Sequence, residues 1–276
     1  MITESGKRMG HDRYSRLAAE HLGDDTARRW TALLRPCVRL RHAADGDPVA
    51  ASLGGTPSLP PGTPWPEWPG QGPLSFVASV DCAALPHEAL PEEFPRDGTL
   101  LFFFYGGDPE DDAFVSADDP ETWAGAQVHH IPADTPVTEA APPPSVAPYP
   151  EVPLTATPEE SAPDLTLPAS AEALLGAPGP WPHPRDTPRE LRPFVRAFTG
   201  LRTSMGHQLA GHPVPLQGPV EHDPAPTGEP WLLLAQFDSD SGAEMSWFDE
   251  GTLYWLIHPK DLAARRFDRI AFTGQC

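Results

Sequence analysis

The chain has 276 residues and a formal net charge of −20, with 38 prolines, 23 glycines and 39% hydrophobic residues. The prolines limit long helices and predict many loops and extended segments. The negative charge disfavours binding to nucleic acid or to an anionic membrane, because phosphates must be neutralised by clustered Lys or Arg. A basic protein partner is compatible with this charge, although acidity also serves solubility.

The three cysteines, Cys37, Cys82 and Cys276, lie far apart and form no CxxC pair. They therefore indicate neither a disulfide framework nor a zinc site. The first ten residues are polar and lack the apolar stretch of a secretory signal, and no run of about 18 apolar residues occurs. We expect a cytoplasmic protein without cofactor or metal.

Residues 1–10 are expected to be disordered, and residues 11–49 to form two helices and a strand. Apolar spacing places the helices within 12–34, and Cys37–His42 follows as the strand. The arginines of this stretch are interpreted as the one basic concentration of the sequence, on a solvated face paired with nearby acids. They are Arg28, Arg29, Arg35, Arg39 and Arg41.

Residues 50–131 begin with a loop at 53–73, where proline and glycine recur every two or three positions. Three strands are predicted after it, together with a short helical turn near Pro120–Trp123. The strands are Leu74–Val80, Thr99–Tyr105 and Gln127–Ile131. The run from Leu100 to Tyr105 is apolar throughout, as expected for a strand that is buried on both faces.

Residues 132–186 are rich in proline, with 11 prolines between 132 and 168, and contain no Lys or Arg before Arg185. We expect an extended strap that lies on the surface, with a mobile middle.

Residues 187–276 are expected to begin with a helix at Thr187–Phe198, capped by Thr187 and kinked at Pro193. A second Gly/Pro-rich loop follows at 206–219. The remaining predicted elements are strands at Trp231–Phe237, Thr252–Ile257 and Arg269–Thr273 and a short helix at Pro259–Ala264.

The two halves of the chain match in order. Pro73–Asp81 aligns without gaps with Pro230–Asp238, and an Asp/Glu-Gly-Thr-Leu motif follows at 97–100 and at 250–253. We therefore predict an α+β fold with an N-terminal helical segment and internally duplicated, largely antiparallel β-sheet units, 50–131 and 187–276. Two such units would share a core across a pseudo-twofold interface, with a ligand groove between them.

The motifs GGTPSLPPGTPWP, PLSFVASVDCAALP, HQLAGHPVPLQG and WLLLAQFDSD occur in an order that resembles the YwqG-like family of unknown function. The resemblance covers roughly residues 50–276 and implies a single cytoplasmic domain over 11–276. It also implies a similarity to immunity components of bacterial toxin systems. The family has Gln before the first-half Asp, where this chain has Ser79; Gln236 retains it in the second half.

Asp81 and Asp238 end the two matching strands and are the main candidate ligand-binding residues, together with Gln236. Two carboxylates related by a pseudo-twofold could form an acid–base dyad or hold a ligand. Alternatively, each could cap the turn that follows it by accepting backbone N–H groups.

Asp240 is a further candidate, because the sequence from Asp238 resembles the opening of a calcium loop. Flanking strands favour a plain hairpin loop instead. Trp65 and Trp247 are candidates for an exposed, ligand-stacking ring, although anchoring in the core or in a loop explains most of the tryptophans. His207 and His212 share a loop without a zinc-binding pattern and are expected to be structural. No nucleophile or nucleotide-binding motif occurs.

The absence of a catalytic motif, the acidity and the resemblance together favour a non-catalytic binding protein that engages another protein, in an immunity-like or adaptor function. The alternative is an enzyme, or a small-ligand or metal binder, that works in the groove between the halves through Asp81, Asp238 and Gln236. The sequence does not identify the ligand, the partner or the oligomeric state.

Overall fold

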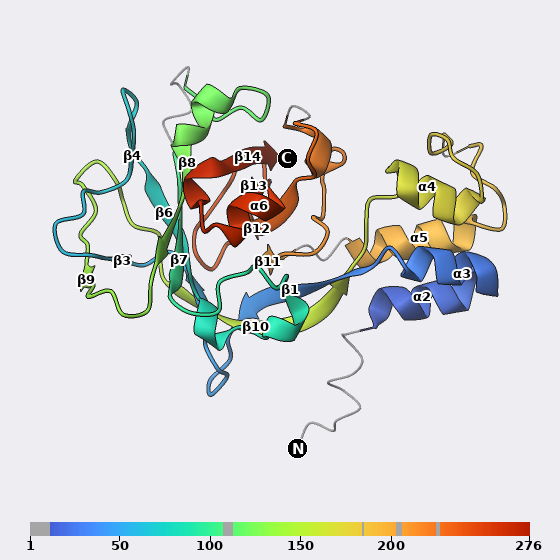
Figure 1. The fold of residues 1–276 in the computed structure, drawn as a ribbon, viewed down its shortest axis with the longest axis horizontal. Helices are drawn as coiled ribbons and strands as arrows, with labels where there is room; N and C mark the ends of the chain where they lie inside the picture. Colours follow the sequence, from blue (N-terminus) through green and yellow to red (C-terminus); the bar gives the residue numbers. More distant parts are fainter. Residues whose placement is uncertain (1–11, 107–112, 184, 203–205, 225–226) are drawn as a thin grey trace.

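The computed structural model describes residues 12–106, 113–183, 185–202, 206–224 and 227–276. The N-terminal residues 1–10, which we expect to be disordered, lie outside the described part. Figure 1 shows a large curved β-sheet beside a separate group of helices. The chain therefore mixes helices with a mostly antiparallel sheet, which confirms the predicted α+β class in its general form.

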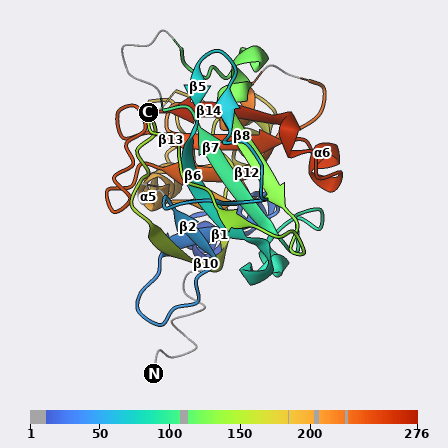
Figure 2. The ribbon, with the colours of Figure 1, turned by 90° about the vertical axis from the view of Figure 1, so that its left-hand side faces the viewer.

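The main sheet has ten strands in the order β14-β13-β12-β11-β1-β10-β2-β6-β7-β8, and its neighbours pair antiparallel. The sheet curls until the terminal strands β8 and β14 approach each other, so that it nearly closes into a barrel (Figure 2). Its strands are β1 (Arg35–His42), β2 (Ala51–Leu53), β6 (Ser75–Asp81), β7 (Thr99–Phe104), β8 (Ala126–Ile131), β10 (Val152–Ser161), β11 (Gln208–Leu209), β12 (Leu232–Asp238), β13 (Thr252–Ile257) and β14 (Ile270–Gln275).

Shorter strands, one short helix and several turns accompany this sheet. Two small two-stranded sheets form: β3 (Ser58–Leu59) pairs with β9 (Thr138–Glu139), and β4 (Glu67–Trp68) pairs with β5 (Gly72–Pro73). One short α-helix, α6 (Pro259–Ala263), and five 3₁₀ turns complete the set. The turns are η1 (Cys82–Ala84), η2 (His87–Ala89), η3 (Pro120–Gly125), η4 (Val220–His222) and η5 (Phe267–Arg269). The predicted strands and the two short helical segments after β7 and β13 are confirmed, with ends that differ by at most two residues.

The inside of the curled sheet holds one continuous apolar core. The Phe102 ring on β7 lies 5.1 Å from the ring of Phe237 on β12 and 5.4 Å from that of Trp255 on β13. Such edge-on aromatic contacts add to the stabilisation that burial provides. The apolar run of β7 is buried from Leu100 to Phe104, as its sequence predicts.

Two four-stranded arms flank the central pair β1–β10: β2-β6-β7-β8 on one side and β11-β12-β13-β14 on the other. Asp81 pairs with Thr99 in the first arm, and Asp238 pairs with Thr252 in the second. The register shifts between Phe76 and Ala78 in one arm and between Leu233 and Ala235 in the other. The irregularity thus falls at the same place in the two segments that the sequence aligns.

The surface position expected for the proline-rich strap is wrong for its second half. Residues Val152–Ser161 form β10, a ten-residue strand that pairs with β1 from Leu154 to Ser161 in the middle of the sheet. Proline lacks an N–H and is usually excluded from central strands. Here β2 covers β10 only at 152–154, so Pro158 has a strand neighbour on one side and its ring nitrogen can face away from β1.

Four helices form a lobe with its own apolar core, seen at the right of Figure 1. They are α2 (Arg13–His21), α3 (Asp24–Thr31), α4 (Pro168–Leu175) and α5 (Arg192–Arg202). Trp30 is fully buried there, with its ring 5.3 Å from Phe194 and 5.6 Å from Phe198. None of the described helices combines the length and the apolar character that crossing a membrane requires.

The start predicted for the helix at Thr187–Phe198 is wrong. Helix α5 begins at Arg192, so Pro193 occupies its first turn instead of kinking its middle. The first helical turn tolerates proline because its N–H groups have no partner within the helix.

The cysteines should differ sharply in reactivity. Cys37 and Cys82 are buried, and burial raises the pKa of their thiols to about 11 and about 12, whereas Cys276 is exposed. Because the thiolate is the reactive form, we expect a thiol-specific reagent at pH 8 to modify one cysteine in the native protein and three in denaturant. The variant C276S should lose the native reaction; a fast native reaction that persists in it would contradict this burial.

Candidate functional site

A loop at residues 206–214 is fixed by two buried glutamines that face each other across β11 and β12. Gln208 pairs with Gln236 in the register of these strands. The Gln208 side chain donates to the carbonyl of His212 over 2.8 Å, and the Gln236 side chain accepts the N–H of Val214 over 3.0 Å. These bonds replace strand pairing and hold the loop in one shape. The side chain of Gln236, a candidate ligand-binding residue, is thus hydrogen-bonded to the loop.

On one side of this loop, His207 belongs to a hydrogen-bonded cluster. Its Nδ1 accepts the backbone N–H of Asp238 over 3.2 Å, so its hydrogen is on Nε2, which lies 3.2 Å from Oδ2 of Asp240. Nε2 of His42 lies 2.7 Å from the same oxygen, and Ala243 N–H donates to Oδ1. Hydrogen bonding, from His207 above all, holds the pKa of the Asp240 carboxyl well below its usual range.

Two imidazoles and a carboxylate are also a common ligand set for transition metals. The candidate ligand atoms of His42, His207 and Asp240 lie within 4.8 Å of one another. However, His207 uses Nδ1 to accept an N–H, so Nε2 carries a hydrogen and has no lone pair for a metal. The arrangement therefore fits a hydrogen-bonded clasp between the end of β1 and the β12–β13 turn better than a metal site.

Asp81 and Asp238 have different surroundings. Asp81 is exposed and accepts the Ala83 N–H over 3.0 Å, which caps η1. Asp238 is half-buried, burial raises the pKa of its carboxyl, and Thr252 donates to it over 3.0 Å. Four strands separate β6 from β12 in the sheet. The structure thus gathers Asp238, Asp240 and Gln236 in one arm and leaves Asp81 in the other.

The two candidate tryptophans anchor loops. Trp65 is half-buried and donates through Nε1 to the carbonyl of Leu74 over 2.8 Å. Trp247 is 3% exposed and donates to the carbonyl of Asp238 over 3.2 Å, with its ring edge-on to Phe104. The Trp247 ring is therefore closed off from solvent.

A hollow of about 830 Å³ lies where the two terminal strands β8 and β14 face each other. Trp123 of η3 meets Trp231 there, with ring centres 6.1 Å apart, and His258 stacks on Trp231 at 3.6 Å. This hollow lies between the two arms, where the sequence predicts a groove. Among the residues that line it are none of the six candidate residues.

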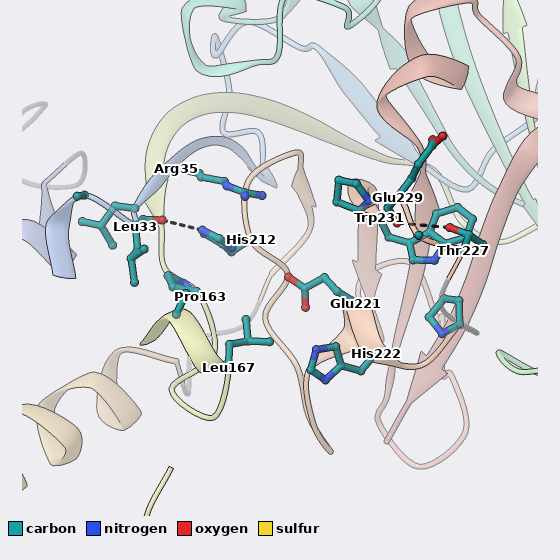
Figure 3. A pocket seen from close by; sticks show the side chains of 16 residues that line it. Leu33, Arg35, Pro163, Leu167, His212, Glu221, His222, Thr227, Glu229 and Trp231 are labelled. Carbon is teal, nitrogen blue, oxygen red and sulfur yellow. Dashed lines mark hydrogen bonds between the residues drawn. The ribbon is translucent and has the colours of Figure 1, made fainter. Parts of the chain in front are cut away.

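A second cavity of about 760 Å³ lies between the helical lobe and the second arm of the sheet (Figure 3), and we call it the lobe–sheet cavity. Its wall is mainly apolar. It is lined by Ala32, Leu33, Leu34, Arg35, Pro163, Leu167, Ala169, His212, Glu221, His222, Pro224, Thr227, Gly228, Glu229, Pro230 and Trp231. Its size is that of a small-molecule site.

His212 is the most distinctive group in this cavity, because the glutamine-held loop presents a buried imidazole there. The side chain is 6% exposed, and Nε2 donates to the carbonyl of Leu33 over 2.8 Å. Its Nδ1 has no hydrogen-bond partner among the described residues. Burial lowers the pKa of this imidazole to about 4. At neutral pH the ring is therefore uncharged and carries a buried lone pair on Nδ1.

Two charged groups lie close to His212. Figure 3 shows Arg35, His212 and Glu221 together on one side of the cavity, with Trp231 and Thr227 opposite. Burial raises the pKa of Glu221, and Arg35 acts against that rise. In the described part of the chain Arg35 forms no salt bridge, and Nε1 of Trp231 donates to no acceptor.

Sequence reasoning missed this constellation. The cavity residues come from segments near 33, 165, 212 and 225, so no local motif marks them. From the sequence, we expect Arg35 to be a solvated residue and His212 to be a structural one, and no pattern indicates a role for Glu221. The proline and glycine content of 206–219 was the available hint, because functional groups often sit on loops held by a rigid scaffold.

A search of curated proteins finds no match for this chain. A family model described as "Domain of unknown function (DUF1963)" matches residues 51–276. The match covers every strand of the main sheet except β1 and leaves out α2, α3 and the part of the lobe–sheet cavity that Ala32–Arg35 supplies. Because it spans most of the chain, the protein belongs to the DUF1963 family.

Proposed function

We propose that this protein is a binding protein whose ligand is a small molecule held in the lobe–sheet cavity. The observation that carries the proposal is the Nδ1 atom of His212, a buried acceptor without a partner in the described protein. Folded proteins satisfy about nine in ten buried polar groups, and the remainder call for an explanation. A ligand that donates a hydrogen bond to this atom supplies one.

The cavity wall defines the chemistry of this ligand. Leu33, Leu167 and Trp231 offer apolar surface to a mainly hydrophobic body. Nδ1 of His212 calls for a hydroxyl or N–H group, and the guanidinium of Arg35 favours a negative charge. The proposed ligand class is therefore a weak organic acid with an apolar skeleton and one hydrogen-bond donor.

The test is a thermal-shift screen of organic acids followed by titration of the hits against variants. A ligand at 100 times its Kd stabilises the folded state by about 2.7 kcal/mol. In R35Q the affinity for a hit should fall roughly 10-fold or more, because a charge-assisted hydrogen bond is lost. H212Q keeps a donor for the Leu33 carbonyl but replaces the Nδ1 lone pair by an amide oxygen at the end of a differently shaped side chain, and a comparable loss is expected.

The matched control is R96Q, which makes the same charge change at an exposed arginine of the sheet body. Its affinity for the hits should equal that of the wild type. Hits that bind R35Q and H212Q as tightly as the wild type occupy another site, and that result would refute the lobe–sheet cavity as the binding site.

The engagement of a protein partner, in the immunity-like or adaptor function expected from the sequence, rests on acidity and on the resemblance to the YwqG-like family. The cavity favours the small-molecule alternative, although at a place other than the groove between the halves. Its polar residues include neither Asp81 nor Asp238. A cytoplasmic location belongs to the same proposal and is supported by three free thiols.

We also infer that the two arms of the sheet descend from one duplicated unit. Support comes from the matching strand orders, the pairing of Asp81 with Thr99 and of Asp238 with Thr252, and the register shifts at equivalent places. Ser52 pairs with Ser79 at the position where Gln208 pairs with Gln236. Each terminal strand also contacts the 3₁₀ turn that precedes the other, β8 with η5 and β14 with η3.

A further inference from the structure

The helical lobe carries a charge opposite to that of the whole protein. Its segments 12–35 and 185–202 contain ten arginines and six acidic residues, whereas the chain as a whole has a net charge of −20. The arginines between Arg28 and Arg41 are the one basic concentration that the sequence predicts. The fold adds a second, because α5 packs against α2 and brings residues 185–202 beside the N-terminal helices.

Three of these arginines surround one hollow. Arg189, Arg192 and Arg196 line a depression of about 440 Å³ together with His21 of α2, and Pro193 is part of its wall. Arg192 and Arg196 are four positions apart and share one face of α5, and Arg189 lies in the turn before the helix. Phe194 and Phe198 on the opposite face of α5 are buried in the lobe core, which fixes the orientation of the arginine face.

One guanidinium of the hollow is already held in place. Arg192 donates through Nε to the carbonyl of Thr187 over 3.0 Å and through Nη2 to that of Arg185 over 3.2 Å. Two of its five N–H groups are used in this way, so three stay available to a ligand. A fixed guanidinium loses less side-chain entropy on binding than a free one does.

The positive charge of the hollow is not neutralised from within. In the described part of the chain, no salt bridge connects Arg189, Arg192 or Arg196 to an acidic side chain. Elsewhere in the lobe arginines do have such partners: Arg28 pairs with Asp25, and Arg13 with Glu159. Like charges on neighbouring helical positions repel each other, and an anion would relieve that repulsion.

We propose that this hollow, formed by Arg189, Arg192, Arg196 and His21, binds a compact anion that carries several phosphate groups. The planar fork of a guanidinium matches the oxygens of a phosphate in pairs, and several forks around one depression suit a polyphosphate. The depression is too small for a folded partner. The site is separate from the lobe–sheet cavity, because the two share no lining residue.

The test is calorimetric titration of the full chain with inorganic tripolyphosphate at constant ionic strength, with citrate as a polycarboxylate of similar charge. The wild type should bind tripolyphosphate at least 10-fold more tightly than citrate. R189Q and R196Q should each weaken tripolyphosphate binding about 10-fold or more, since each removes charge-assisted bonds. Arg192 is left unchanged because it holds the turn at 185–187.

R28Q is the matched control, since it removes the same charge from the same lobe outside the hollow. It should bind tripolyphosphate within twofold of the wild type. R196K keeps the charge without the fork and should fall between the wild type and R196Q. Equal weakening in R28Q, R189Q and R196Q would show general charge attraction and overturn the site. The site would also be overturned if the wild type bound citrate as tightly as tripolyphosphate, or if it did not bind tripolyphosphate at all.

Discussion

Replacing Glu159 by glutamine should lower the free energy of unfolding by about 3–5 kcal/mol, the cost of breaking a buried ion pair on one side. Glu159 lies on β10, and its carboxylate is within 2.6 Å of Arg41, 3.8 Å of Arg39 and 3.9 Å of Arg13. Arg39 is 4% exposed, and its guanidinium also donates through Nη1 to the carbonyl of Gly206 over 3.2 Å. In E159Q the Arg39 charge stays buried and loses its ion-pair partner.

Urea denaturation followed by tryptophan fluorescence measures this loss. The matched control is E160Q, the same change at the next residue, where Glu160 accepts bonds from the backbone and hydroxyl of Ser15 at the start of α2. We expect it to cost about 1 kcal/mol, as loss of a helix cap does. The double variant R39M/E159L should recover most of the loss, because replacing both partners by apolar side chains removes the uncompensated charge. If E159Q and E160Q lower the free energy of unfolding by the same amount, the stability does not depend on pairing Arg39 with Glu159.

Acid should destabilise the protein through His212 as the pH falls from 6.5 toward 4. The pKa of this imidazole falls from 6.5 to about 4 on folding, because burial disfavours the charged ring and Arg35 lies nearby. The folded state therefore favours the neutral ring. The stability contributed by this group is fully present above pH 6.5 and is lost as the pH falls through 4. A shift of this size amounts to about 3 kcal/mol.

The measurement is the free energy of unfolding between pH 8 and pH 4 for the wild type and for H212Q. Glutamine does not titrate and retains an N–H for the Leu33 carbonyl. The wild type should lose up to about 1.4 kcal/mol per pH unit more than H212Q between pH 6 and pH 4.5. Contributions of Glu221 and His222, which face the same cavity, are present in both proteins and cancel in the difference. Parallel pH profiles for the two proteins would show that His212 is not buried as a neutral ring.

The strand positions could be predicted because each strand carries its own signal. The apolar run of β7 and the alternating segments of β6 and β12 predict buried strands whatever their neighbours. The prediction of a surface strap at 132–168 was wrong in its second half, because the local sequence there gives no signal for a strand. Pro153 and Pro158 argue against a central strand, and only the short reach of β2 makes Pro158 acceptable in β10.

The candidate residues show the same contrast between neighbours that are close in the sequence and partners that only the fold brings together. Gln236 and Asp238 lie in β12 and Asp240 lies just after it, so the proximity of these three residues follows from the sequence alone. Their partners could not be found in this way, because His42 lies 198 residues from Asp240 along the chain. Asp81 and Asp238 occupy matching positions in the sequence, yet four strands of the sheet lie between them.

The sequence alone determined the α+β class, the three longest strands of each arm, and the absence of a local catalytic motif, because these follow from short-range periodicity and spacing. Only the tertiary structure determined which polar and charged side chains lie close together. It placed His212 beside Arg35 and Glu221, and it brought α5 against α2 to form the arginine-lined hollow. These contacts join segments more than 150 residues apart. Their geometry depends on how the sheet curls and how the lobe packs, which no local pattern encodes.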